Sequence, residues 1–286
     1  MNIEALLASS IDGLMLGFIY GLAAMGLTLI FGVMRVINIA HGPIVMLGMY
    51  TVYVLTTQFG LNPYLAIFLS IFLALLFGVV MYFVAVHKVI NAPELTTLLA
   101  TFSVSLIIIG VATVVFTTTP HALDVTLPGF QAGAITILGT RAVAVLIAII
   151  VTAALYAFLY RTRTGKSIRA VANNRSAAEL MGINTSGVLG LAFGIGTMLA
   201  AISGGLIATL FSFTVLSGGN YEAKSFVIVV LGGLGNPSGA LLGGIVLGLL
   251  EGITTIFVPV AWVPIFEYVI FVLILLVRPN GLFGAR

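Results

Sequence analysis

Three polar residues interrupt the apolar sequence near its N-terminal end at a spacing of three: Arg35, Asn38 and His41. Residues three apart share one face of a helix, so the spacing predicts a polar helical face that ends at the Gly42-Pro43 pair. Polar groups deep in apolar sequence usually face a cavity or each other. The pattern therefore favours a site that contacts a polar solute. The alternative is a cytoplasmic turn, in which Asn38 and His41 hydrogen-bond the backbone.

A lone carboxylate, Glu251, lies inside the apolar stretch GIVLGLLEGITTIF. An acidic side chain at the centre of a membrane helix costs several kcal/mol, so Glu251 is expected to pair with a polar group on another helix. Glu267 is less informative, because it is expected nearer an interface.

The remaining residue patterns argue against an enzyme. His41, His87 and His121 lack metal-ligand spacing such as H-E-x-x-H, and there is no cysteine. No G-x-x-x-x-G-K-[ST] phosphate loop occurs, so the chain is not expected to bind ATP itself. We predict no catalytic residue, no metal ligand and no cofactor.

Composition gives the class of protein. The 286 residues are 61% hydrophobic and 7% charged, with a mean hydropathy of +1.27, whereas soluble domains carry roughly 25% charged residues. We therefore predict one transmembrane domain, residues 1–286, in a lipid bilayer. The net charge of +3 reflects basic residues between apolar runs, so a nucleic-acid partner is not expected.

Eight apolar runs are candidates for membrane helices: about 11–33, 43–59, 63–86, 98–118, 142–160, 188–215, 225–258 and 261–277. With the N-terminus outside, all but two of the eleven basic residues lie on the cytoplasmic side, the exceptions being Arg141 and Lys224. We therefore predict an external N-terminus and a cytoplasmic C-terminus.

The C-terminal runs present a length problem. Residues 225–277 must cross an odd number of times, but they are too few for three helices of about 20 residues each. We predict a broken or re-entrant segment near residues 225–258, at the glycine-rich stretch 231–244. A plain loop at the membrane surface is the alternative. Glycines four apart, such as Gly244, Gly248 and Gly252, predict closely packed helices.

One cytoplasmic loop, residues 161–187, carries five basic residues within fifteen positions. Ser176 and Glu179 have capping-box spacing and Gly182 follows as a C-cap, which predicts a short helix over about 177–181. Apolar residues on such a loop favour a protein partner or the lipid surface. We favour a docking element for a soluble partner.

Four segments, in this order, resemble the membrane permease subunits of ATP-driven importers for branched-chain amino acids, within a wider group that includes sugar and urea permeases. They are YGLAAMGLTLIFGVMRVINIAHGPIVMLGMY (20–50), TGKSIRAVANNRSAAELMGIN (164–184), VLGGLGNPSGALLGGIVLGLLEG (230–252) and LVRPNGLFG (276–284). The resemblance covers essentially the whole chain. It implies an all-α, polytopic helical bundle of the type II ABC importer kind.

The resemblance also implies roles for particular residues. Contacts with a cytoplasmic ATPase would come from matching positions of the charged loop: Arg169, Ala170, Ala177, Ala178 and Gly182. The solute pathway would involve Asn38, His41, Gly42 and Glu251. This chain departs from the family at Pro43, where an acidic residue is typical.

The partners that the resemblance implies are a second permease subunit, two ATP-binding subunits and an extracytoplasmic solute-binding protein, assembled in the plasma membrane. ATP would be bound by the ATPase subunits only. The expected solute is a branched-chain or other apolar amino acid, because few charges are available to neutralise a strongly charged one. Urea, short amides and aromatic acids are alternative solutes, and a channel or secondary transporter is an alternative class.

Overall fold

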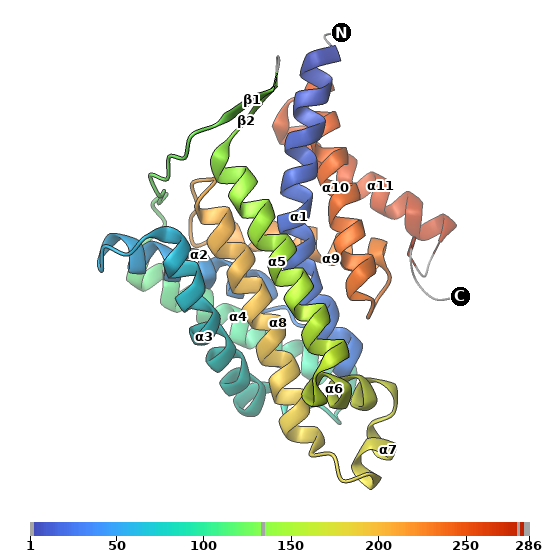
Figure 1. The fold of residues 1–286 in the computed structure, drawn as a ribbon. Coiled ribbons are helices and arrows are strands. Elements are labelled where there is room, and N and C mark those ends of the chain that lie inside the picture. The colour runs from blue at the N-terminus through green and yellow to red at the C-terminus, as the bar shows by residue number, and fades with distance from the viewer. Residues whose placement is uncertain (1–2, 133–134, 279–280, 283–286) are drawn as a thin grey trace.

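A computed structural model describes residues 3–132, 135–278 and 281–282. The described chain is a helical bundle with a small hairpin, which confirms the predicted all-α class (Figure 1). The helices are α1 Ile3–Met34, α2 His41–Thr57, α3 Pro63–Met81, α4 Glu94–Phe116, α5 Gly139–Arg161, α6 Arg163–Asn173, α7 Arg175–Leu180, α8 Thr185–Ala208, α9 Ser217–Gly232, α10 Pro237–Phe257 and α11 Val263–Val277. A π-helical turn, η1 Tyr82–Val86, extends α3, and a 3₁₀ turn, η2 Val260–Trp262, precedes α11.

Seven helices of the described chain are long and apolar enough to cross a membrane: α1, α3 with η1, α4, α5, α8, α10, and η2 with α11. Two further helices are shorter, α2 with 17 residues and α9 with 16. The C-terminal part of the chain has too few residues for three full-length helices, and the short α9 accounts for the difference. The chain is a multi-pass membrane protein.

The helix break predicted within 231–244 lies between α9 and α10. Gly233 and Gly235 both have positive φ, at 89° and 81°, which glycine adopts without a steric penalty. The Asn236 side chain then caps α10 by accepting a hydrogen bond from the Gly239 N–H at 3.2 Å, and Pro237 stands in the first turn. The break lies against Gly32, near the end of α1.

Glycines allow α1 and α10 to pack in direct backbone contact. A Cβ atom on Gly248 would lie only 2.5 Å from the Gly17 Cα, and one on Gly252 only 3.0 Å from the Gly13 Cα. Because the glycine numbers rise along α1 as they fall along α10, the two helices run antiparallel. The predicted packing role of the four-residue glycine spacing is confirmed here.

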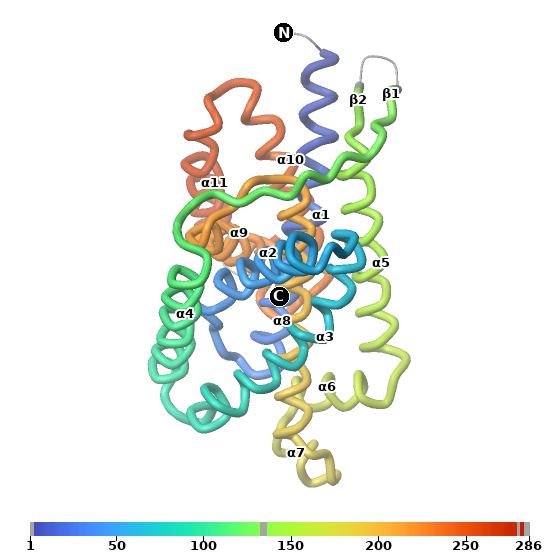
Figure 2. The backbone as a smooth tube through the Cα atoms, turned by 90° about the vertical axis from the view of Figure 1, so that its left-hand side faces the viewer, coloured from blue at the N-terminus to red at the C-terminus, as the bar shows by residue number. Residues whose placement is uncertain are grey.

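The helices differ strongly in how much of their surface the bundle covers. The most apolar windows of α1 and α8 are 78% and 89% buried, whereas those of α4 and α11 are 22% and 11% buried. Figure 2 shows α4 and α11 on the same side of the molecule, flanking α9. Exposed apolar helices need lipid or a protein partner, so this side is available for both.

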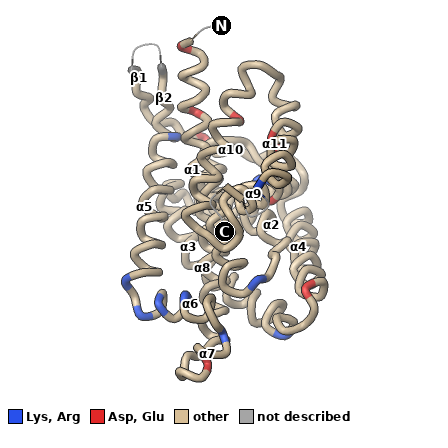
Figure 3. The backbone as a smooth tube through the Cα atoms, turned by 90° about the vertical axis from the view of Figure 1, so that its right-hand side faces the viewer, with Lys and Arg blue, Asp and Glu red and all other residues tan. Residues whose placement is uncertain are grey.

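Charge is distributed unevenly along the bundle. Lys and Arg gather at the end that carries α6 and α7, and the N-terminus lies at the opposite end (Figure 3). The opposite end also holds the hairpin of β1 Phe130–Ala132 and β2 Ile135–Ile137, paired antiparallel with Phe130 opposite Ile137. This asymmetry follows the positive-inside pattern. Arg286, which the sequence count assigns to the basic end, lies outside the described residues.

Candidate functional site

The polar residues near the first break do not share a helix face, so that prediction is wrong. Helix α1 ends at Met34, Arg35 has a positive φ of 52°, and α2 begins only at His41. The backbone turns at Arg35, and the residues between α1 and α2 have no helical structure. Backbone strain at a non-glycine residue often marks a functional site.

The burial of two of its side chains distinguishes this segment from a solvated turn. Arg35 is exposed, but the side chains of Asn38 and His41 are completely buried. The Asn38 Oδ1 accepts a hydrogen bond from the Ala40 N–H at 3.1 Å, which forms a local turn. Neither His41 ring nitrogen makes a hydrogen bond of ordinary geometry within the described chain, although the ring lies near the Ala23 backbone. Such unsatisfied polar groups are expensive to bury.

A threonine on α4 holds the irregular segment in place. The Thr101 hydroxyl accepts a hydrogen bond from the Ile39 N–H at 3.3 Å and lies 3.2 Å from the Ile37 carbonyl oxygen, to which it donates. Sequence reasoning did not single out Thr101. Its sequence signal was weak, because a threonine in an apolar helix most often bonds its own backbone, as Thr101 also does with the Leu98 carbonyl at 3.0 Å.

The N-terminal ends of the two short helices, α2 and α9, meet at a pair of glycines. A Cβ atom on Gly218 would lie 2.6 Å from the Gly42 carbonyl oxygen, so the two backbones touch. The Glu222 carboxylate lies close by, since its Oε2 is 2.9 Å from the position that a Gly42 Cβ would take. A carboxylate therefore does lie beside the Gly42-Pro43 pair, and it comes from α9 rather than from residue 43.

A cavity of about 1000 Å³ lies between this irregular segment, α4, and the end of α9. Val36 and Ile37 form part of its wall, whereas Asn38, His41 and Gly42 do not line it. Arg35 and Glu94 both line it, which places one cationic and one anionic side chain in the same space. Ala172 of α6 also lines the cavity, so the charged loop reaches it.

Glu251 pairs with a polar group on another helix, as the sequence predicts. The Lys224 Nζ on α9 lies 2.5 Å from Glu251 Oε2 and 3.3 Å from Glu267 Oε1 on α11, although the latter contact lacks hydrogen-bond geometry. The Lys224 ammonium also lies 4.5 Å from the centre of the Tyr20 ring. Glu267 is only 2% exposed, so its carboxylate is covered by the protein. This cluster lines a separate cavity of about 270 Å³, so Glu251 does not join Asn38 and His41.

We expect Lys224→Met to destabilise the protein by about 3 to 5 kcal/mol, because it leaves two nearby carboxylates in a largely buried place without a cation. Thermal unfolding of the purified protein in detergent measures the effect. Adding Glu251→Gln to this variant should recover part of the loss.

The Arg141–Asp12 ion pair is a matched control, because it has the same 2.5 Å separation but its Asp12 side chain is 43% exposed. Arg141→Met should cost no more than about 1 kcal/mol. Equal losses for Arg141→Met and Lys224→Met would show that the buried cluster has no special role in stability.

The charged loop folds into two helices, α6 and α7. The Thr162 side chain caps α6 by accepting from the Gly165 N–H at 3.0 Å. Ile168 and Val171 on α6 are 1% and 2% exposed, and they pack inward on the bundle, where α6 contacts α1, α5 and α8. These apolar residues therefore need neither a separate partner nor lipid, contrary to the expectation from sequence.

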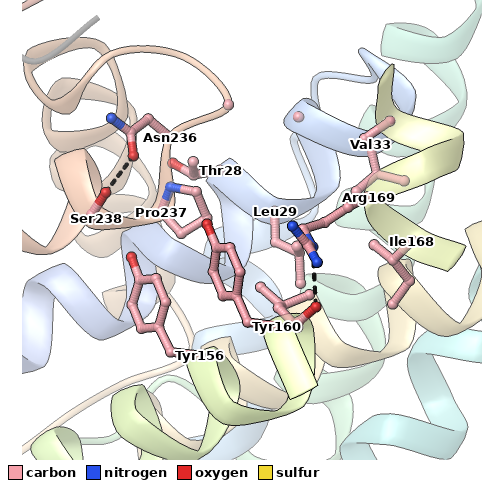
Figure 4. A pocket seen from close by; sticks show the side chains of 14 residues that line it. Thr28, Leu29, Val33, Tyr156, Tyr160, Ile168, Arg169, Asn236, Pro237 and Ser238 are labelled. Atoms are coloured by element: carbon pink, nitrogen blue, oxygen red, sulfur yellow. Dashed lines mark hydrogen bonds between the residues drawn. The ribbon is translucent and has the colours of Figure 1, made fainter. Parts of the chain in front are cut away.

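Arg169 fixes α6 onto the end of α5. Its Nε donates to the Leu159 carbonyl oxygen at 3.1 Å, and its guanidinium carbon lies 4.4 Å from the centre of the Tyr160 ring. Figure 4 shows Arg169 across a small cavity of about 170 Å³ from the start of α10, where the Ser238 hydroxyl donates to Asn236 Oδ1 at 2.6 Å. The charged loop is thus adjacent to the α9–α10 break.

The short helix predicted at 177–181 exists as α7, with its start two residues earlier. Asn174 rather than Ser176 is the N-cap, and its side chain accepts from the Ala177 N–H at 3.0 Å. The predicted capping box is wrong, because the Glu179 carboxylate accepts a hydrogen bond from the Thr185 hydroxyl at 2.6 Å instead. Gly182 does terminate the helix with a positive φ of 79°.

The predicted coupling residues divide by exposure. Ala170, Ala177 and Gly182 are exposed and available to a partner, whereas Ala178 is 4% exposed and packs inside. The most prominent apolar groups at the tip of the loop are Leu180 and Met181, with 89% and 81% of their surface exposed. Sequence reasoning missed both residues, because nothing in the local pattern distinguishes outward from inward apolar side chains in so short a helix.

The sequence matches the family described as "Branched-chain amino acid transport system / permease component" over residues 9–277. The chain belongs to this family. The permease is 28% identical over 292 residues to the high-affinity branched-chain amino acid transport system permease protein LivH of Salmonella typhimurium, which covers 96% of this chain and 94% of the relative. It is 28% identical over 290 residues to BraD of Pseudomonas aeruginosa, a permease protein with the same description, with the same coverage.

Sugar permeases are more distant relatives. The fructose import permease protein FruG of Bifidobacterium longum is 33% identical over 131 residues, which is 43% of this chain and 38% of the relative. No solved structure matches the permease. The family is one of transporter membrane subunits, so the chain is the permease subunit of an ABC importer rather than an enzyme.

Proposed function

We propose that the permease carries a branched-chain or similar apolar amino acid across the plasma membrane, driven by ATP hydrolysis on partner subunits. The observation that carries this proposal is the cavity of about 1000 Å³, because Ala172 of α6 forms part of its wall. A movement imposed on α6 and α7 by a partner would therefore alter the cavity directly. Conformational change of this kind is what alternating access requires.

The charges of the cavity suit an amino acid. Such a solute is zwitterionic, with one ammonium and one carboxylate group. Arg35 and Glu94 supply one guanidinium and one carboxylate to the same cavity, so both ends of the solute have a counter-charge there. The remaining lining is mainly apolar, including Leu27, Phe31 and Phe226, which suits an aliphatic side chain.

The proposed assembly contains a second permease subunit, identical or related, two cytoplasmic ATPase subunits and an extracytoplasmic binding protein. The relatives LivH and BraD are permease proteins of branched-chain amino acid transport systems, which supports this arrangement. The basic end of the bundle would be cytoplasmic and the N-terminus outside. ATP would bind the ATPase subunits and no cofactor would bind this chain. The wall of the solute pathway would be supported by Asn38, His41 and Gly42. Contact with the ATPase subunits would be made by Arg169, Ala170, Ala177 and Gly182.

Reconstitution tests the proposed function. The permease is copurified with its partner subunits, placed in proteoliposomes, and supplied with binding protein and radiolabelled leucine. Uptake should require both ATP and the binding protein, and parallel assays with urea and with an aromatic acid should give little uptake.

Two results would contradict the proposal in different ways. Exchange or leakage of leucine by the purified chain alone, without ATP, would indicate a channel or secondary transporter. ATP-dependent uptake of urea or an aromatic acid, but not of leucine, would preserve the importer and overturn the solute class.

A further inference from the structure

A long apolar groove is lined by residues of α3, α5 and α8. Figure 1 shows α8 between the other two helices. Its volume is about 680 Å³. On α5 it extends from Ile147 to Phe158, and on α8 from Ile202 to Leu191. Nearly every lining side chain is aliphatic or aromatic, so the groove suits a hydrocarbon chain.

The groove is long enough to hold an acyl chain. Eleven residues separate Ile147 from Phe158, and at a rise of about 1.5 Å per residue the groove is roughly 16 Å long. The hydrocarbon core of a bilayer is about 30 Å thick, so one leaflet contributes about half of that thickness. The groove starts near the basic end of α5, and on α3 it reaches Tyr64, in the first turn of that helix.

The end of the groove at the α5–α6 corner is positively charged. Thr164 lines the groove, and the neighbouring side chains of Arg161, Arg163 and Lys166 are exposed. The N-terminus of α6 begins at the same corner, and its dipole also favours an anion. The groove therefore combines an apolar channel long enough for an acyl chain with a cationic end, which is the complement of an anionic phospholipid.

We infer that this groove binds one anionic phospholipid of the cytoplasmic leaflet, with an acyl chain between α3 and α5 and its phosphate at Arg161, Arg163 and Lys166. The leaflet assignment rests on the proposed orientation, but the binding itself does not. Because the phosphate site spans the junction of α5 and α6, the bound lipid contacts α6, the first helix of the charged loop.

The test measures phospholipid binding to the purified full-length permease by native mass spectrometry, with phosphatidylglycerol and phosphatidylcholine of identical acyl chains. Phosphatidylglycerol should bind preferentially as a single tight adduct. Ala154→Trp should abolish that adduct, because Ala154 lines the groove and a large ring there blocks the acyl chain. Ala153→Trp is the matched control, since Ala153 is exposed on the same helix turn but does not line the groove.

Charge variants test the phosphate site. Each surface basic residue is worth about fivefold in affinity for an anionic lipid, so Arg161→Ser, Arg163→Ser and Lys166→Ser together should weaken the phosphatidylglycerol adduct by about a hundredfold. Lys88→Ser and Arg278→Ser, exposed basic residues on other elements, should have little effect.

Three outcomes would overturn the inference. Equal binding of the two lipids would show that the charged corner does not select an anionic headgroup. Equal loss of binding with Ala153→Trp and Ala154→Trp would show that the lipid lies outside the groove. A groove covered by a second copy of the chain would give dimers that Ala154→Trp dissociates, with no lipid adduct lost. None of these readings depends on transport, so the proposed function stands or fails separately.

Discussion

We expect that replacing Leu180 and Met181 together by aspartate abolishes the stimulation of ATP hydrolysis by the loaded binding protein and leaves the membrane level of the permease unchanged. Both side chains project from the tip of the charged loop with more than four-fifths of their surface exposed, so nothing in the permease itself depends on them. Fully burying a leucine or methionine side chain is worth about 1.5 to 3 kcal/mol, and aspartate at these positions would lose that contribution. The measurements are the ATPase rate of the reconstituted complex and copurification of the ATPase subunits.

Asn173→Asp is the control, because it introduces a carboxylate at another exposed position of the same loop. It should leave stimulated ATP hydrolysis close to the original rate. Full stimulation in the Leu180→Asp, Met181→Asp double variant would show that the ATPase docks elsewhere. Gly182→Glu is a less selective probe, since Gly182 has a positive φ and any side chain there also strains the backbone.

Gly218→Ala is expected to destabilise the permease by about 3 kcal/mol or more and to eliminate transport. Its Cβ would lie 2.6 Å from the Gly42 carbonyl oxygen and 3.1 Å from the Pro43 nitrogen, and both are backbone atoms that cannot rotate away. The N-terminal ends of α2 and α9 would have to separate, which moves the segment that supports the cavity wall. Thermal unfolding and leucine uptake by the reconstituted complex measure the two effects.

Gly219→Ala is a closely matched comparison in the same helical turn, because no atom lies within 4 Å of the position of its Cβ. Alanine favours a helix more than glycine does, so this change should be neutral or stabilising by up to about 1 kcal/mol. If the two variants unfold at the same temperature and transport equally well, the α2–α9 contact is not a constraint on the fold.

The sequence was most informative where a property is local. Polar and apolar residues partition between water and lipid one segment at a time, so the membrane class, the helical fold and the charged loop could all be predicted from composition and spacing. The α9–α10 break and the Gly182 helix end were also predictable, because glycine and proline act on their own backbone. The capping residue of α7 was not, since Glu179 bonds Thr185 in another helix.

The candidate site was harder to predict, because it depends on which helices meet. The sequence marks Asn38 and His41 as unusual, but it does not show that both are completely buried. The hydrogen bond from Ile39 to Thr101 and the carboxylate of Glu222 involve α4 and α9, which are far away in the sequence. No sequence pattern pairs Lys224 with a carboxylate, yet its ammonium lies beside Glu251 and Glu267.

By itself, the sequence determined that this chain spans a membrane as a helical bundle, that one end is basic, and that the chain breaks between α9 and α10, because each follows from the solvation and backbone freedom of neighbouring residues. Only the tertiary structure decided which breaks face each other. The touching backbones of Gly42 and Gly218 and the cavity shared by Arg35, Glu94 and Ala172 depend on contacts between distant segments. Such contacts are set by the packing of whole helices, which no local pattern specifies.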